Sequence, residues 1–373
     1  MQSASESPQL VVVANRLPVR RTPDDDGTLR WTTSPGGLVS ALTPALAESG
    51  RGCWVGWDGS IDDDEPASGV PDLPGEVNGI RLVDIPISVD ELENHYDGMS
   101  NGTLWPLYHD KIGTVEFHRH WYDGYRRVNR RFAEATAEAA DENAVVWIHD
   151  YQLQLVPGML REIRPDLTIG FFLHIPFPPR ELFQQLPWRT GLSEGILGSD
   201  LIGFQTPQAI ANFHGVVNHL GLTTSIDENL LEYQGRTIRT SAYPIGIDVD
   251  RYQDAAASHT IMEASRDLRA RLGNPQTVLL GVDRLDYTKG IDVRLRAFRE
   301  LLADGELHAS QVTMVQVAEP SRDKVDAYVD VRNRVERLVS EINGDYGRVG
   351  FPVVHYIHQS QSFDELMALY RTA

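Results

Sequence analysis

Disulfides, membrane spans and secretion signals are all missing from this sequence. The chain of 373 residues contains a single cysteine, Cys53, which cannot form a disulfide within the chain. No apolar run approaches the roughly 20 residues of a membrane-spanning helix, and the first ten residues contain neither the basic nor the apolar region of a secretory signal. These absences predict a soluble, cytoplasmic protein without a membrane partner.

Positive charge is also scarce, and lysine is scarcer still. The chain has 34 lysines and arginines against 53 aspartates and glutamates, which gives a formal net charge of −19. The lysines among them are Lys111, Lys289 and Lys324 alone. Nucleic acids and anionic membranes select basic surfaces, so an acidic chain matches neither. We therefore expect no nucleic-acid partner, and any anionic ligand must be held by a local cluster of arginine or lysine.

The common nucleotide-binding motifs are absent as well. The sequence has neither a G-x-G-x-x-G turn nor a Walker lysine loop, which argues against a dehydrogenase or an NTPase. Two acidic runs, 24–26 and 62–65, lack the ordered ligand spacing of a calcium loop, and runs of charge are usually solvated. We predict that the protein has no metal site and needs no cofactor.

What is present is a repeated alternation of buried strands and helices. Short apolar runs end in polar loops and are followed by helical patterns, which is typical of an α/β protein with parallel sheets. A chain of this length favours two domains. A turn-rich segment, Ile238 to Ile245, separates two such series. We predict an N-terminal domain of residues 1–243 and a C-terminal domain of residues 244–373.

One strand–loop–helix unit in the second series carries two cations. The buried strand Val278–Val282 leads into a loop with Arg284 and Lys289, and Gly290 opens a helical pattern. Ligands of α/β proteins bind at the carboxyl ends of parallel strands, and a helix start favours anions. The unit therefore predicts an anion-binding loop. The alternative is a surface loop with two solvated cations.

The first series begins with a similar arrangement. The apolar run Leu10–Ala14 predicts a central parallel strand, which puts Arg16 at its carboxyl end. The segment Arg20–Arg30 is predicted to be a polar loop. Gly36 and Gly37 then open a helical pattern, and glycines at a helix start let a ligand approach the backbone closely. A plain turn is the alternative explanation of that glycine pair.

Aromatic residues follow in the region of the next strands. The run 54–57 ends in Trp57, and Tyr96 and Trp105 flank a predicted Gly/Asn-rich loop, Asp97–Gly102. Aromatic rings can support a sugar, because the C–H faces of a pyranose stack on them. Ordinary core packing is the alternative. The long helical pattern His118–Ala139 carries several arginines, which we interpret as a solvated face.

Two neighbouring strand patterns end in ionisable side chains. The run 144–148 is followed by Asp150, and the run 168–173 is followed by His174 and a proline-rich loop that favours a rigid site. Asp150 is a candidate acceptor for a substrate hydroxyl. It is also a candidate N-cap for a helix predicted over Tyr151–Ile163, and the two roles are compatible. In the second series, Arg322 lies in a first helical turn after a strand, next to the predicted N-cap Ser321.

These features together resemble those of one enzyme family. The motifs that carry the resemblance are NR at 15–16, SPGGL at 34–38, GW at 56–57, LWP at 104–106, HDY at 149–151, FFLHIPFP at 171–178, DRLDYTKG at 283–290 and PSR at 320–322. Their residues, order and spacing are similar to those of the α,α-trehalose-6-phosphate synthases over nearly the whole chain. The resemblance implies a GT-B architecture, in which two Rossmann-like domains face a cleft. It also implies a metal-independent, retaining transfer of glucose from a nucleotide diphosphate glucose to glucose 6-phosphate, which gives trehalose 6-phosphate.

The resemblance further implies roles for individual residues. Those implied to bind the donor are Gly36, Gly37, His174, Arg284, Lys289 and Phe363, the last near the nucleotide base. Those implied to bind the acceptor are Arg16, Trp57, Tyr96, Trp105, Asp150 and Arg322, the last at its phosphate. We expect Arg284 and Lys289 to be the main electrostatic catalysts, with His174 and Asp150 beside the reacting groups.

The chain departs from the family pattern in two places. Gln152 follows the HDY motif where many members have histidine. The family also continues beyond this chain into a segment with a glycine-rich donor loop and two acidic donor contacts. We therefore expect the C-terminal domain to be incomplete and residues 1–373 alone to bind acceptor yet turn over poorly.

Several questions stay open at this point. The donor nucleotide is UDP, ADP or GDP, and the oligomeric state, a homo-oligomer included, is undetermined. Two other functions remain: a related synthase with a polyol-phosphate acceptor, and a non-catalytic sugar-phosphate sensor on the same fold. We hypothesise that the leaving phosphate oxygen takes the proton of the acceptor hydroxyl on the same face of the sugar, because we identify no suitably placed nucleophilic carboxylate.

Overall fold

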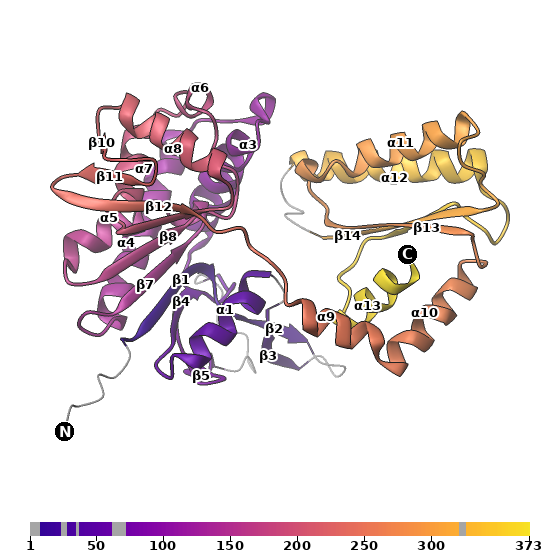
Figure 1. Ribbon diagram of the computed structural model, residues 1–373, viewed down its shortest axis with the longest axis horizontal. Helices are drawn as coiled ribbons and strands as arrows, with labels where there is room; N and C mark the ends of the chain where they lie inside the picture. The colour runs from indigo at the N-terminus through magenta and orange to yellow at the C-terminus, as the bar shows by residue number, and fades with distance from the viewer. Residues whose placement is uncertain (1–7, 24–27, 35–36, 62–71, 321–325) are drawn as a thin grey trace. The chain divides into compact units, whose positions relative to one another are not determined.

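The computed structural model describes residues 8–23, 28–34, 37–61, 72–320 and 326–373 (Figure 1). These residues form two compact units, Met1–Ile245 and Gly246–Ala373. The division falls within two residues of the one expected from the turn-rich segment, after residue 243. Each unit has its own sheet and its own helices, so each is described separately.

A ten-stranded sheet forms the centre of the first unit. Its inner strands, from β12 to β6, run parallel, and short antiparallel strands close both edges. The order across the sheet is β10 (Thr224–Ser225), β11 (Leu230–Tyr233), β12 (Arg236–Ala242), β9 (Leu201–Phe204), β8 (Thr168–Phe172), β7 (Val145–His149), β1 (Leu10–Arg16), β4 (Cys53–Trp57), β6 (Ile80–Asp84) and β5 (Glu76–Val77). Because the inner strands are parallel, their carboxyl ends lie along one edge of the sheet.

Helices follow most of these strands. They are α1 (Gly37–Glu48), α2 (Val89–Glu91), α3 (Trp105–Tyr108), α4 (Arg119–Ala139), α5 (Val156–Ile163), α6 (Arg180–Phe183), α7 (Arg189–Ile196) and α8 (Pro207–His219). The longest, α4, buries Tyr125, Val128 and Phe132 against the unit and leaves Arg126 and Arg127 exposed. The predicted solvated face of this helix is therefore confirmed for those two arginines.

The predicted Gly/Asn-rich loop at 97–102 is wrong, because this stretch is helical. Residues Leu92–Leu104 form a wide π-type helix, η1, which continues into α3. A Cβ atom at Gly98 would lie 2.5 Å from the ring of Trp121, and one at Gly102 would lie 2.9 Å from it. The glycines therefore allow η1 to pack closely on α4, a tertiary requirement that resembles turn composition in the sequence.

Two other stretches pair as strands where the sequence predicted loops or turns. The polar segment after Arg16 contains β2 (Val19–Pro23) and β3 (Leu29–Thr33), which pair antiparallel. Thr22 and Thr32 hydrogen-bond across this pair at 2.7 Å, and Arg21 covers the ring of Trp31 at 4.9 Å. The turn-rich segment 238–245 mostly belongs to β12, which pairs with β9. Cross-strand partners that are distant in sequence decide both cases.

The second unit has a three-layered arrangement (Figure 1). Its parallel sheet has the order β13 (Thr277–Arg284), β14 (Val312–Glu319) and β15 (Val354–Ile357). One face packs on α11 (Ile291–Ala303) and α12 (Asp326–Tyr346), and the other packs on α10 (His259–Arg271) and α13 (Phe363–Thr372), beside α9 (Val249–Ala257). The near-continuous apolar sequence of the strands follows from this burial on both faces.

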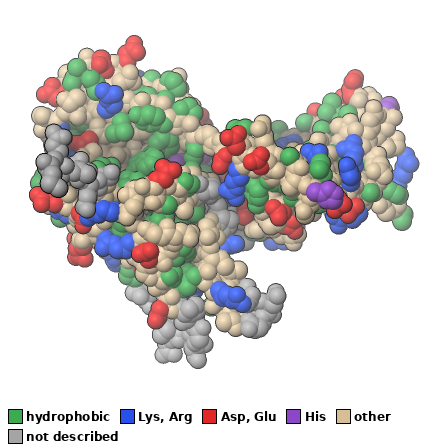
Figure 2. Space-filling model, turned by 60° about the horizontal axis from the view of Figure 1, so that its bottom comes forward, with side chains coloured by type: hydrophobic (Ala, Val, Ile, Leu, Met, Phe, Trp, Pro, Cys, Tyr) green, Lys and Arg blue, Asp and Glu red, His purple; other side chains and the backbone are tan. Residues whose placement is uncertain are grey.

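The surface agrees with the composition of the chain. On the face drawn in Figure 2, acidic and basic side chains lie interspersed over both units. Among the described residues, none of the helices is both long enough and apolar enough to span a bilayer. The α/β class and the parallel sheets predicted from the sequence are confirmed.

Candidate active site

The predicted site residues of the first unit lie at the carboxyl ends of adjacent strands. Arg16 is the last residue of β1 and Trp57 is the last residue of β4. Asp150 directly follows β7, and His174 lies two residues beyond β8. Because β8, β7, β1 and β4 are neighbours in the sheet, the fold brings together side chains that are up to 158 positions apart in the sequence, the difference between residues 174 and 16.

Arg16 is held in place by its backbone and by one aromatic ring. Its carbonyl accepts a hydrogen bond from Trp54 Nε1 at 3.0 Å, and its guanidinium carbon lies 4.0 Å from the ring centroid of Trp57. A side chain at Gly59, where φ is +97°, would overlap the guanidinium. Within the described parts of the chain the guanidinium has no hydrogen bond or ion pair, and the residue is exposed. Arg16 therefore places a positioned positive charge at the carboxyl end of β1.

The other two predicted aromatic residues occupy different positions. Tyr96, on η1, lies edge-on to Trp57 with 6.5 Å between ring centroids. Trp105 is buried and packs against His109 at 4.2 Å and Tyr151 at 5.4 Å. Tyr96 thus joins the group around Arg16, whereas Trp105 belongs to an adjacent aromatic layer that supports the turn after Asp150.

Two carboxylates at the carboxyl ends of β4 and β6 were missed by the sequence analysis. Asp58 follows β4 and accepts a hydrogen bond from Arg21 Nη2 at 2.9 Å, and its backbone N–H donates to Oδ1 of Asp84 at 2.9 Å. Burial and the nearby charge of Asp58 raise the pKa of Asp84 to about 6. The sequence did contain a signal for Asp58, because this acidic residue directly follows the strand that ends in Trp57.

Asp150 has a strained backbone. Its φ of +75° and ψ of 172° lie in a region that side chains other than glycine rarely adopt. Its N–H donates to the carbonyl of Phe172 at 2.8 Å, and its Oδ1 accepts from the backbone N–H of His174 at 3.2 Å. It makes no side-chain N-cap bond, and the predicted continuous helix is instead a 3₁₀ turn, Tyr151–Leu153, followed by α5. Asp150 therefore occupies the N-cap position of the turn, but the predicted side-chain cap and the continuous helix are wrong.

His174 is paired with a histidine that the sequence analysis did not select. Its Nε2 lies 3.0 Å from Nδ1 of His149, the last residue of β7. Loss of solvent lowers the pKa of both imidazoles, and the charge of Asp150 partly opposes this for His174. Both rings are therefore neutral at physiological pH. A pocket of about 220 Å³ lies beside them, lined also by Trp147, Phe172 and Tyr243.

The second unit carries the predicted anion-binding loop. Arg284 is the last residue of β13, Lys289 ends a 3₁₀ turn, and Gly290, with φ of +61°, precedes α11. Arg284 and Lys289 are both exposed. A pocket of about 200 Å³ lies at this end of the sheet, and Arg284 lines it together with Asp283 and other residues of β13, β14 and α13.

A buried carboxylate shapes the turn between the two cations. Asp286 is fully enclosed, and its oxygens accept hydrogen bonds from the Thr288 N–H and the Tyr328 hydroxyl, each at 2.9 Å. This bonding orders the short turn that carries Lys289. The sequence showed Asp286 as a loop residue and gave no sign of its burial, because Tyr328 is 42 positions away.

The remaining predicted residues are only partly described. Gly37 is the first residue of α1 and is exposed. Phe363 begins α13, where Arg251 covers its ring at 4.5 Å and Tyr252 lies edge-on at 5.4 Å. Gly36 and Arg322 lie outside the described residues, as do the two acidic runs.

Among the described residues, no group of side chains is arranged to bind a metal ion. No three histidine, cysteine, aspartate or glutamate side chains gather there as metal ligands do. The first unit instead offers Arg16, aromatic rings and neutral imidazoles, and the second unit offers Arg284 and Lys289. Such groups bind phosphorylated sugars through charge, stacking and hydrogen bonds.

Comparison with known proteins agrees with this chemistry. The model of glycosyltransferase family 20 matches residues 8–373. A trehalose-6-phosphate synthase of Mycolicibacterium smegmatis is 50% identical over 380 residues, which cover 100% of this chain and 74% of the relative. The chain thus spans about three quarters of that protein's length.

Solved structures show the same fold. A UDP-forming α,α-trehalose-phosphate synthase from Burkholderia xenovorans in complex with glucose-6-phosphate superposes with a TM-score of 0.86 at 32% identity, covering 98% of this chain and 77% of the other. A structure described as trehalose-6-phosphate from E. coli bound with UDP-2-fluoro glucose gives a TM-score of 0.85 at 33% identity, covering 98% and 76%. The neighbours are GT-B enzymes, which confirms the predicted fold class, and the chain belongs to glycosyltransferase family 20.

Proposed function

We propose that this protein transfers glucose from UDP-glucose to glucose 6-phosphate and forms α,α-trehalose 6-phosphate with retention at the anomeric carbon. The relatives and neighbours are named as trehalose-6-phosphate synthases, and a neighbour of this fold was solved with glucose-6-phosphate. The UDP-forming neighbours, and another bound to UDP-2-fluoro glucose, favour UDP over ADP or GDP as the donor nucleotide.

The observation that carries the proposal is the arrangement around Arg16. An exposed guanidinium with no ion pair among the described residues lies over Trp57, with Tyr96 at its side. Such a cation binds a phosphate or an anionic sugar, and the rings contact the sugar's C–H face. We assign this group to the acceptor, together with Trp105, Asp150 and Arg322.

The second unit supplies the groups that suit a diphosphate. Arg284 and Lys289 lie on the short segment between β13 and α11, whose first N–H groups add partial positive charge. We assign these cations to the donor diphosphate, with Gly36 and Gly37 contacting the donor through the backbone, His174 bonding its glucose and Phe363 near its base.

In the proposed reaction the bond between the anomeric carbon and the phosphate oxygen breaks, and its electron pair stays with UDP. The anomeric hydroxyl oxygen of glucose 6-phosphate bonds to the same face of that carbon. Its proton passes to the leaving phosphate oxygen. Arg284 and Lys289 stabilise the negative charge that develops, so they contribute most in the transition state. The reaction as proposed requires neither a metal nor a cofactor.

Product analysis tests the proposal. Incubation of the full-length protein with UDP-glucose and glucose 6-phosphate is expected to yield UDP and trehalose 6-phosphate, with an α,α linkage visible in the anomeric couplings of the proton NMR spectrum. Parallel reactions with ADP-glucose, GDP-glucose and glycerol phosphate are expected to be slower. Faster transfer to glycerol phosphate would mean a polyol-phosphate synthase, and binding of both ligands by the full-length protein without any turnover would favour the sensor.

A calorimetric titration separates binding from turnover. Glucose 6-phosphate is expected to bind the wild-type chain and to bind the Arg16→Ala variant at least tenfold more weakly. The control is Arg20→Ala, which removes an exposed arginine of β2 outside the group around Arg16. Equal affinity in all three proteins would contradict the assignment of Arg16 to the acceptor.

A further inference from the structure

The histidine pair at the carboxyl ends of β7 and β8 contains a group that the proposed reaction does not yet use. His149 is almost completely enclosed, with 1% of its surface exposed. Its Nδ1 lies 3.0 Å from Nε2 of His174, and its ring packs on Trp147 with 4.7 Å between centroids. Within the described part of the chain, the other nitrogen, His149 Nε2, has no hydrogen-bond partner.

The enclosure of Nε2 decides which histidine donates. A neutral imidazole carries one proton, on either Nδ1 or Nε2. If His174 were the donor, His149 would have to carry its own proton on Nε2, where no acceptor reaches it. An orphaned N–H in a protein interior is rarer than an orphaned acceptor, and its desolvation is costly. The favoured arrangement therefore has the Nδ1–H of His149 donating to Nε2 of His174.

This direction fixes the proton of His174 as well. Because its Nε2 accepts a hydrogen bond, the proton of the neutral ring must be on Nδ1. His174 is half-buried, and its Nδ1 has no hydrogen-bond partner among the described residues. The backbone N–H of His174 is bonded to Asp150 at 3.2 Å, so the chain beneath the ring is also held. The ring therefore presents a single N–H donor in a fixed orientation.

We propose that His149 is a positioning residue that holds His174 as the Nδ1–H tautomer, so that His174 always offers a donor to a substrate oxygen. The functional half of this inference rests on the proposed function, in which His174 bonds the donor glucose. A ring that exchanged between tautomers would offer its donor only part of the time, and the apparent affinity would fall by that fraction.

Two substitutions separate the hydrogen bond from the bulk of the ring. His149→Phe keeps a ring of similar size and removes both nitrogens, and the 220 Å³ pocket beside His149 gives the phenyl ring room. His149→Asn places an amide N–H near the position of Nδ1 and so retains a donor to His174. The first variant also removes the enclosed, unpartnered Nε2, so its thermal stability is expected to stay close to that of the wild type.

The decisive readout is the tautomer itself. Long-range proton–nitrogen NMR spectra of 15N-histidine-labelled protein at pH 7.5, assigned with His149→Phe and His174→Gln, are expected to show Nδ1–H for both rings. His174 is expected to become a mixture of tautomers in His149→Phe and to return to Nδ1–H in His149→Asn. Finding Nε2–H at either wild-type ring, or an unchanged tautomer of His174 in His149→Phe, would overturn the inference. This readout does not depend on enzyme activity.

Ligand binding tests the functional half. The dissociation constant of UDP-glucose is expected to rise about threefold to tenfold in His149→Phe, the range for loss of one neutral hydrogen bond, and to recover in His149→Asn. The affinity for glucose 6-phosphate is expected to stay unchanged in both. If His174→Gln weakens UDP-glucose and His149→Phe does not, only the role of His149 is wrong. If neither variant changes it, the assignment of His174 to the donor fails.

Discussion

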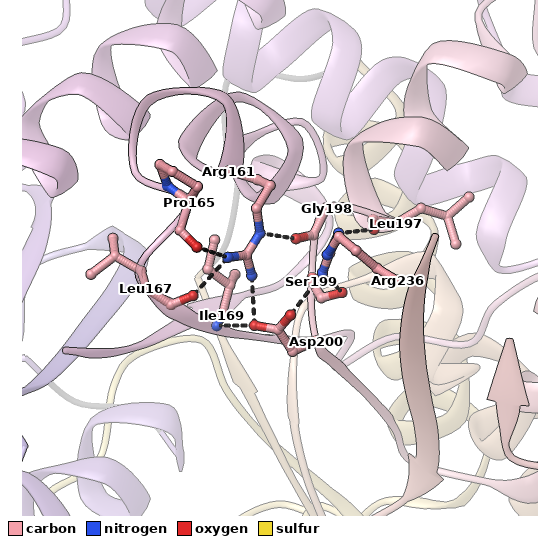
Figure 3. Close-up of polar contacts among 9 residues, drawn as sticks. All are labelled: Arg161, Pro165, Leu167, Ile169, Leu197, Gly198, Ser199, Asp200 and Arg236. Carbon is pink, nitrogen blue, oxygen red and sulfur yellow. Dashed lines mark hydrogen bonds and ion pairs between the residues drawn. The ribbon is translucent and has the colours of Figure 1, made fainter. Parts of the chain in front are cut away.

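The two ends of the strands in the large sheet are built for different purposes. At the amino ends of β8, β9 and β12, Asp200 accepts hydrogen bonds from Arg161 at 2.6 Å and Arg236 at 2.7 Å, and also from the backbone N–H of Ile169 at 2.8 Å (Figure 3). Both guanidiniums donate further to backbone carbonyls, which in Figure 3 surround them; the acceptors are Pro165, Leu167, Leu197, Gly198 and Ser199. The charges at this end are therefore satisfied by the protein itself.

The carboxyl ends of the same sheet are left incomplete. Among the described residues, the guanidinium of Arg16 has no hydrogen bond or ion pair, and Nε2 of His149 is buried without a hydrogen-bond partner. Asp150 has a strained backbone. The strained backbone of Asp150 and the buried, unpartnered nitrogen of His149 each cost stability. The comparison indicates that arginine stabilises the fold at one edge, and at the other edge we propose that it binds a ligand.

The largest effect is expected from a substitution in the second unit, where Lys289 follows the carboxyl end of β13. Lys289→Ala is expected to lower kcat by about 100-fold to 1000-fold, as loss of one electrostatic catalyst does, because the leaving diphosphate loses a cation. Steady-state kinetics with UDP-glucose and glucose 6-phosphate measure it, and the acceptor KM is expected to change little. The control is Lys111→Ala, an exposed lysine of the first unit. Unchanged turnover in Lys289→Ala would contradict the proposed role.

At the carboxyl end of β1, Arg16→Ala is expected to raise the acceptor KM by about 10-fold to 100-fold, because a charge-assisted contact to an anion is lost. The melting temperature is expected to stay within the error of the measurement, since Arg16 bonds to no described residue through its guanidinium. Kinetics and calorimetric melting of the same preparation check both statements. A large loss of stability would mean that the two edges of the sheet do not differ as described.

The opposite result is expected at the amino ends. Asp200→Ala leaves two part-buried guanidiniums without their carboxylate and is expected to lower the free energy of unfolding by about 2 kcal/mol. Urea denaturation measures this, and KM values of the remaining folded protein are expected to be unchanged. Glu162→Ala, which breaks an exposed ion pair with Arg130, is the control and should cost less. Altered KM values would contradict a purely structural role.

Asp150 allows stability and activity to be separated at one position. Asp150→Gly relieves the backbone strain and is expected to raise the free energy of unfolding by about 1 kcal/mol while removing most of the activity. Asp150→Asn keeps the strain, so it is expected to lose activity without the gain in stability. Denaturation curves and turnover rates of both variants test this. A destabilised glycine variant would show that the carboxylate, and not the backbone, dominates at this site.

The smallest expected effect concerns the pH dependence caused by Asp84. Its folded pKa of about 6 lies above the ordinary aspartate value of 3.8, so the native state binds more protons than the unfolded state between these values. Stability from this group is present below pH 4 and is lost as the pH rises through 6. Asp84→Asn is therefore expected to gain about 1 kcal/mol on the wild type between pH 4 and pH 7.5, after allowance for solvent screening. Thermal melting of both proteins at pH 4 and pH 7.5 measures this. An equal difference in stability between variant and wild type at the two pH values would refute the prediction.

Part of the site was predictable because it is local in sequence. An arginine directly after an apolar strand pattern, or a lysine before a helix-opening glycine, is placed by β- and α-periodicity alone. Arg16, Asp150, Arg284 and Lys289 were located in this way, and the structure puts each at a strand's carboxyl end or in the turn that follows. Their roles remain proposals, since binding is a property of the assembled group.

The errors have a common physical cause. The glycines of η1 were interpreted as turn residues because composition alone does not show the ring of Trp121 against them. The β2–β3 pair was interpreted as a loop because neither strand shows a clear apolar periodicity. The two strands are stabilised by pairing with each other. The partners of Asp286 and His174 were missed because they are 42 and 25 positions away.

The sequence by itself thus determined the α/β class, the parallel strands and the family, since apolar periodicity and ordered motifs are properties of neighbouring residues. Only the tertiary structure decided which charges are satisfied and which are not. Burial and hydrogen-bond geometry depend on residues that the fold brings together. Arg161 comes before a strand in the sequence and Arg16 comes at the end of one, and only the structure shows that Arg161 is paired with Asp200 whereas Arg16 lies over the ring of Trp57.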